Sequence, residues 1–371
     1  MANQSSRCEI ELVVEKNTSN VISHNNSLNN RSSLMSLDSA LTKFHAGYFR
    51  ISLSLGGQAL LWKTVIDQRD ETNTLRRVAH TLPVTGLWFL ALFILLLLSL
   101  LYLLRCLFHF KMVKAEFLHD VGVSYLFAPW ISWLLLLQSA PFVAPKTSNY
   151  LVLWWVFVVP VVVLDVKIYG QWFIKGKRFL SSAANPTSQM SVIGNLVGAQ
   201  AAAHMGWKES AVWLFSIGIV HYLVLFVTLY QRLSGDRLPG LLRPVFFLFF
   251  AAPGIASLAW ESIVGTFDTA SKMLFFQALF LFTSLVCRPM LFKKSMRRFN
   301  VAWWAYSFPV TVLALASTYY AQEVKGTIPN ILMLFFLALS VIVSLALTLV
   351  TLVNSKKLLP DNEPTASLLI S

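Results

Sequence analysis

The stretch LWFLALFILLLLSLLYLL occupies residues 87–104 and contains 18 consecutive residues without a charge. An α-helix rises about 1.5 Å per residue, so a segment of this length can cross most of a hydrocarbon core about 30 Å thick. Its backbone polar groups would all be paired within the helix, which lipid requires. The stretch therefore predicts a transmembrane helix.

The whole chain has the same character. Of its 371 residues, 56% are hydrophobic and only 13% are charged, and the mean hydropathy is +0.63. A soluble domain carries about 25% charged residues because water must solvate its surface. The three cysteines and seven histidines lack metal-ligand spacing, and no phosphate-binding loop is present. We therefore expect a membrane protein with no cofactor, no metal ion, no nucleic-acid partner and no enzymatic activity.

Further apolar segments follow one another along the chain. They predict an all-α membrane protein with ten transmembrane helices in residues 41–354, between a disordered tail at 1–40 and a short tail at 355–371. The expected spans are 42–62, 82–108, 121–143, 149–173, 185–204, 207–231, 243–263, 269–290, 299–320 and 328–353.

Lysine and arginine predict the orientation. The loops after even-numbered spans hold 14 of them, whereas the alternate loops hold 7. Positive residues collect on the cytoplasmic side of membrane proteins, so both termini are expected to be cytoplasmic. The chain would then be a multi-pass membrane protein that contacts lipid.

The odd-numbered spans carry prolines, glycines and small polar residues, and we expect the even-numbered ones to be plain apolar helices without such features. Pro129, Pro186, Pro253 and Pro309 fall in spans three, five, seven and nine, and span one carries glycines instead. A proline inside a helix frees a carbonyl, which persists in a membrane only beside protein or a watery cavity. We expect the odd helices to be kinked at a similar depth and to enclose a central pore. The alternative is that these prolines serve only packing.

Several segments carry a resemblance to a known family. They are FHAGYFRISLSLGGQALLW (44–62), FLHDVGVSYLFAPWISWLL (117–135), ANPTSQMSVIGNLVGA (184–199), FFLFFAAPGIASLAW (246–260) and FNVAWWAYSFPVT (299–311). These segments closely resemble plant slow-type anion channels, a family related to bacterial tellurite-resistance and dicarboxylate transporters.

The resemblance implies five helical hairpins in a quasi-five-fold bundle around a central pore. It also implies assembly into a trimer, chloride and nitrate as the permeating ions, and a phenylalanine gate at the position of Phe308. Long tails phosphorylated by kinases are typical of the family's guard-cell members, so the short tails here place a regulatory kinase in question. The candidate pore-lining or kink residues are Gly47, Arg50, Gly56, Phe127, Pro129, Pro186, Gly194, Pro253 and Pro309.

Arg50 departs from the family pattern, which has a small residue here. It could bind anions, pair with a carboxylate, block conduction or extend to the cytoplasmic interface. Three functions therefore stay open. The chain is a slow, weakly voltage-dependent channel for passive anion efflux, a silent regulatory subunit of a mixed trimer, or a proton-linked anion or dicarboxylate transporter.

Overall fold

The computed structural model describes residues 38–67, 74–175, 184–232, 240–289 and 299–354. The expected tail at 355–371 and almost all of the tail at 1–40 therefore lie outside the described residues. Every regular element within the described ranges is helical. This confirms the all-α prediction for the part of the chain that the structure covers.

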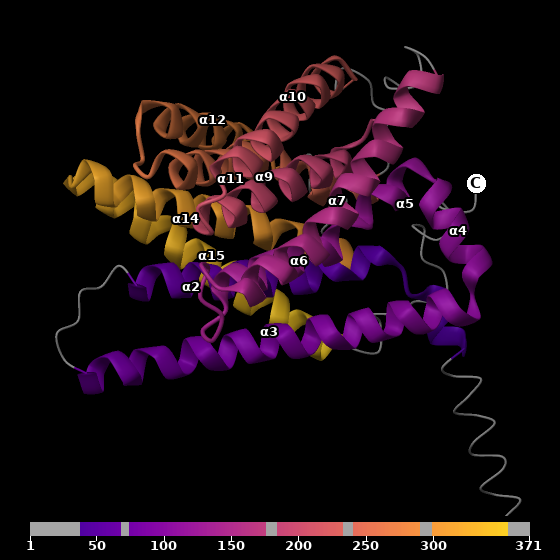
Figure 1. The fold of residues 1–371 in the computed structure, drawn as a ribbon, viewed down its shortest axis with the longest axis horizontal. Helices are drawn as coiled ribbons and strands as arrows, with labels where there is room; N and C mark the ends of the chain where they lie inside the picture. Colours follow the sequence, from indigo (N-terminus) through magenta and orange to yellow (C-terminus); the bar gives the residue numbers. More distant parts are fainter. Residues whose placement is uncertain (1–37, 68–73, 176–183, 233–239, 290–298, 355–371) are drawn as a thin grey trace, which may run out of the picture.

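Long helices follow one another as hairpins, and the two helices of each hairpin contact each other. Figure 1 shows α3 and α10 at opposite edges of the bundle, with α9 and α11 between them. The hairpins are α2 (Arg50–Asp67) with α3 (Thr74–Phe108), α6 (Phe127–Ser139) with α7 (Ser148–Lys175), α9 (Gln189–His204) with α10 (Lys208–Arg232), α11 (Leu248–Val264) with α12 (Thr269–Val286), and α14 (Ser307–Val324) with α15 (Thr327–Val353).

Eight helices among the described residues are long and apolar enough to cross a membrane. The expected spans at 42–62 and 185–204 overlap α2 and α9, which are not among the eight. Helix α9 has 16 residues, and α2 carries Arg50, Lys63 and Asp67. Both helices are largely buried by their neighbours, so they need less apolar surface than a helix surrounded by lipid.

The first helix of each hairpin lies inside the bundle. Helix α2 contacts α6, α6 contacts α9, α9 contacts α11, α11 contacts α14, and α14 contacts α2, so these five inner helices form a closed ring of contacts. In the span Val301–Val324, 89% of the apolar window is buried, against 17% in Leu82–Phe108. The second helices therefore present their apolar side chains outward, where lipid would solvate them.

Each inner helix begins in the same way, with a short helical segment before the α-helix itself. In four cases that segment is a 3₁₀ helix, and before α6 it is the short α-helix α5. The segments are η1 (Ala46–Phe49), α5 (Asp120–Tyr125), η2 (Pro186–Ser188), η3 (Gly240–Phe247) and η5 (Val301–Tyr306), and α4 (Phe110–Leu118) precedes α5. The same beginning therefore recurs in all five hairpins.

Candidate ion pathway

Phe308 packs against α2 at the point where α2 and α14 meet. Its side chain is only 1% exposed. A Cβ atom placed on Gly57 would lie 3.3 Å from Cδ2 of Phe308 and 3.5 Å from Cγ2 of Thr311. Because glycine has no side chain, the aromatic ring can approach the backbone of α2 this closely. The ring therefore fills the space between two inner helices at this level.

Hydroxyl and amide groups fix the helices on both sides of this contact. Ser54 Oγ donates to Ser307 Oγ at 2.5 Å. Gln58 Nε2 donates to Thr311 Oγ1 at 2.9 Å and to Ser340 Oγ of α15 at 2.7 Å. These buried polar groups would be costly to leave unpaired in a membrane. Their pairing holds the residue before Phe308 at a defined position along α2.

Two of the candidate glycines bring inner helices close to their neighbours. A Cβ atom on Gly56 would lie 3.4 Å from Cβ of Leu135 on α6. A Cβ atom on Gly194 would lie 3.3 Å from Cδ1 of Phe127 and 3.2 Å from Cγ1 of Val161 on α7. Small residues at such contacts let helix backbones approach each other. The structure thus brings Phe127 and Gly194 together and places Gly56 and Gly194 in helix packing.

The prolines do not share one position within their helices. The expected interior kink is wrong for Pro186, which is the first residue of η2 and follows the helix-capping residue Asn185. Pro129 and Pro309 are each the third residue of their α-helix, close to the junction with the preceding segment α5 or η5. Pro253 is buried in the interior of α11. Pro186 therefore starts its helical segment, whereas Pro129 and Pro309 lie near the junction between two helical segments.

Pro129 lies on a groove between α3, α4, α6 and α7. The groove has a volume of about 640 Å³, and Phe49, Tyr102, Trp133 and Pro160 also line it. Pro160 lies inside α7, a helix expected to be without such features. Pro129 is therefore on the side of α6 that faces the outer helices.

Arg50 is buried at the start of α2. It is 6% exposed, and its Cζ atom lies 4.3 Å from the centroid of the Tyr125 ring. Its Nη2 atom would be 3.5 Å from a Cβ atom on Gly47, whose N–H donates to His45 Nδ1 at 3.0 Å. No carboxylate among the described residues forms an ion pair with Arg50. Among the described residues, Arg50 therefore neither pairs with a carboxylate nor extends into solvent.

A second buried arginine does have a carboxylate partner. Arg105 Nη1 lies 3.4 Å from Glu116 Oε2, with side-chain exposures of 5% and 1%. The other oxygen of Glu116 accepts from the Ala46 N–H at 2.8 Å. Glu116 therefore joins α3 and α4 to the beginning of the first inner helix. The sequence analysis missed this pair because 11 positions separate Arg105 and Glu116, across a helix boundary.

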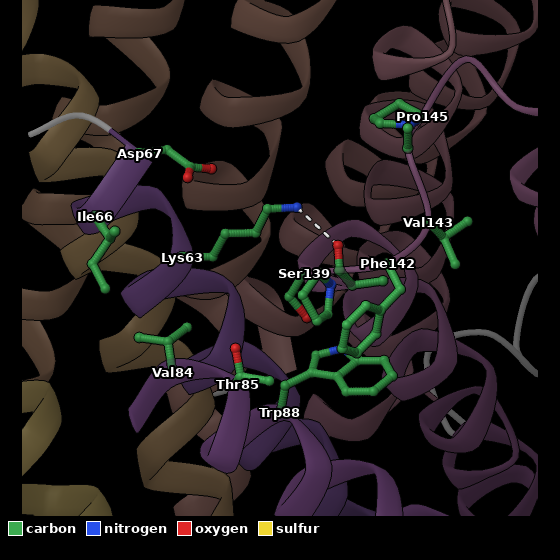
Figure 2. A pocket seen from close by; sticks show the side chains of 13 residues that line it. Lys63, Ile66, Asp67, Val84, Thr85, Trp88, Ser139, Phe142, Val143 and Pro145 are labelled. Atoms are coloured by element: carbon green, nitrogen blue, oxygen red, sulfur yellow. Dashed lines mark hydrogen bonds between the residues drawn. The ribbon is translucent and has the colours of Figure 1, made fainter. Parts of the chain in front are cut away.

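Lys63 lies near the other end of α2. Its Nζ atom donates to the carbonyl oxygens of Gln138 at 2.9 Å and Ala140 at 3.3 Å. Figure 2 shows Lys63 pointing toward the end of α6, above Trp88 and Phe142. These residues line a cavity of about 390 Å³ between α2, α3 and the connection after α6. A cation suits this place because the last carbonyls of a helix carry negative partial charge.

The site contains a residue whose role the sequence analysis did not identify. Among the glycines of span one, Gly57 lies directly against Phe308. The two adjacent glycines, Gly56 and Gly57, were the sequence feature that could have indicated a close contact here. Within the described ranges, no three His, Cys, Asp or Glu side chains are placed to hold a metal ion.

Comparisons with known proteins identify the family to which this chain is similar. The family model described as voltage-dependent anion channel matches residues 43–353. S-type anion channel SLAH1 of Arabidopsis thaliana is 59% identical over 327 residues, which cover 87% of this chain and 84% of the relative. Guard cell S-type anion channel SLAC1 of the same plant is 44% identical over 291 residues, 77% of this chain and 51% of the relative. A tellurite resistance protein TehA homolog of Haemophilus influenzae is 25% identical over 286 residues, 76% of this chain and 83% of the relative.

Proposed function

Because this chain belongs to the voltage-dependent anion channel family, we propose that it is a slow, weakly voltage-dependent channel for passive efflux of chloride and nitrate across the plasma membrane. At a potential of −100 mV, each monovalent anion gains about 2.3 kcal/mol on leaving the cell. No coupled energy source is therefore needed. Anion passage follows from the family, and the choice of ions is part of the proposal.

The proposed pathway runs between the five inner helices. The closed ring of contacts from α2 through α6, α9, α11 and α14 supports it, as does the outward display of apolar side chains by α3 and α12. Ten spans arranged as five hairpins around this axis would leave the second helix of each hairpin in contact with lipid.

The observation that carries the proposal is the burial of Phe308 against Gly57. An aromatic ring across a narrow apolar passage excludes a hydrated anion, and an anion stripped of water without new partners is strongly disfavoured. Phe308 would therefore be the gate. Rotation of this one side chain, or a small displacement of the first turn of α14, would open the passage.

Voltage-clamp recording in oocytes tests the gate. Phe308→Ala should carry anion current in the absence of an activating signal, whereas the wild type should carry little. The matched control is Phe250→Ala, because Phe250 is equally buried on inner helix α11 but packs against Phe247 and Phe282. A large current from the control, or no current from Phe308→Ala at normal surface expression, would contradict the gate.

The proposal includes cytoplasmic termini and assembly into a homotrimer or a mixed trimer with related subunits. Accessibility of terminal epitope tags in intact and permeabilised cells tests the orientation. Native mass spectrometry of the purified protein gives the number of subunits. Phosphorylation of the tail at 1–40 by a regulatory kinase would be an additional input.

One observation favours a silent regulatory subunit as a second candidate function. Arg50 places a buried cation at the start of α2, where tight retention of an anion would limit throughput. Co-expression with a conducting relative distinguishes the two functions. A changed partner current without any current from this chain or its Phe308→Ala variant would favour the silent subunit. A reversal potential that follows the proton gradient would instead indicate a proton-linked transporter.

A further inference from the structure

We propose that Arg50 forms an anion-binding site at the entrance to the pathway and that this site prefers planar oxyanions such as nitrate over spherical halides. The inference rests on the proposed function for its role in conduction. The binding site itself rests on the burial and the contacts of Arg50.

The charge on Arg50 is not neutralised within the described residues. The side chain is more than nine-tenths buried, and its described charged contact is with the face of Tyr125 at 4.3 Å. The nearby buried carboxylate of Glu116 is already held by Arg105 and by the Ala46 N–H. A guanidinium group never loses its proton in a protein. In the proposed site, a small anion from solution supplies the counter-charge.

Arg50 lies on the same face of α2 as the residue that contacts the gate. Arg50 and Gly57 are seven positions apart, which is close to two helical turns, and Gly57 lies against Phe308. Seven residues correspond to about 10 Å along the helix. An anion bound to Arg50 would therefore lie about two helical turns from Phe308, on the same face of α2.

The contact with Tyr125 is also the basis for the proposed preference for nitrate. A cation–π contact uses the face of the guanidinium group and leaves N–H donors at its edge. Two parallel N–H groups match two oxygens of a planar oxyanion, whereas a halide has no such fork.

Anion binding to the whole protein in lipid nanodiscs tests the site without requiring current. Increasing sodium nitrate should raise the midpoint of thermal unfolding of the wild type more than equal sodium chloride does, with sodium gluconate balancing ionic strength. Arg50→Gln should weaken nitrate binding about tenfold or more, as expected for loss of a charged hydrogen-bonding partner. Arg50→Lys should retain binding but lose the preference for nitrate. Lys63→Gln, which removes a cation at the other end of α2, should bind nitrate like the wild type.

Current recordings provide a second readout in the Phe308→Ala background. The cytoplasmic nitrate concentration that gives half-maximal current should rise about tenfold when Arg50→Gln is added. Nitrate stabilisation of Arg50→Gln equal to that of the wild type would overturn the site. If Arg50→Gln does not fold, an unchanged nitrate preference in Arg50→Lys overturns it. Absence of current from Phe308→Ala contradicts the proposed gate instead, and the binding measurements still decide the role of Arg50.

Discussion

Replacement of Glu116 by glutamine should destabilise the protein by about 3–5 kcal/mol, the usual cost of removing one partner from a buried ion pair. The substitution preserves the shape of the side chain and an oxygen that can accept from the Ala46 N–H. It removes only the charge that faces Arg105. Because Arg105 is 5% exposed, water cannot readily replace the lost carboxylate.

The distance between the two groups sets the scale of this effect. At 3.4 Å and an effective dielectric constant of about 20, two unit charges attract by roughly 5 kcal/mol. Desolvation of both groups offsets much of that attraction in the intact pair. Removal of one group forfeits the attraction and leaves the desolvation cost of the other. The Arg105→Gln/Glu116→Gln double variant should therefore be less destabilised than the sum of the two single variants.

A double-mutant cycle on the purified protein in nanodiscs measures this coupling. Unfolding free energies of the wild type, the two single variants and the double variant should give a coupling of about 2 kcal/mol or more. Glu209→Gln is the matched control, because Glu209 is exposed in the first turn of α10 and its loss should cost at most about 1 kcal/mol. Single-variant losses under about 1 kcal/mol that simply add would refute the reasoning.

Two further predictions concern local packing and helix capping. Gly122→Ala should strongly reduce folded yield, because the new Cβ atom would lie 2.3 Å from the backbone oxygen of Glu116, whereas Gly170→Ala should be tolerated because nothing lies within 4 Å; equal yields would contradict this. Asp268→Ala should lower stability by about 1 kcal/mol by removing the cap to the Ser271 N–H, and Asp268→Asn should recover most of the loss in the same unfolding assay.

The positions of the helices could be predicted closely from the sequence. The expected span at 207–231 is helix α10 at Lys208–Arg232, and the span at 328–353 is helix α15 at Thr327–Val353. Lipid imposes this result locally, since each crossing segment must be apolar and must pair its own backbone groups. The exceptions are α2, which carries three charged residues, and α9, which has 16 residues. Neighbouring helices rather than lipid surround both segments.

The candidate site could be predicted only in part. Phe308 was identified by resemblance to a family, and the residues themselves gave no reason to separate it from the other phenylalanines. Pro186 was expected inside a helix because it lies in an apolar segment, but Asn185 provides the cap that lets the helix begin at the proline. Apolar periodicity does not register such a capping interaction.

The amino-acid sequence by itself determined that this chain crosses a membrane repeatedly, where its helices lie, and which of them carry small and polar residues. Only the tertiary structure decided that Phe308 meets Gly57, that Ser54 bonds Ser307 across 253 positions, and that Arg50 is buried against Tyr125. The physical reason is that the two effects act over different ranges along the chain. Solvation by lipid acts on each segment separately, whereas these contacts form only when helices that are distant in the sequence pack against each other.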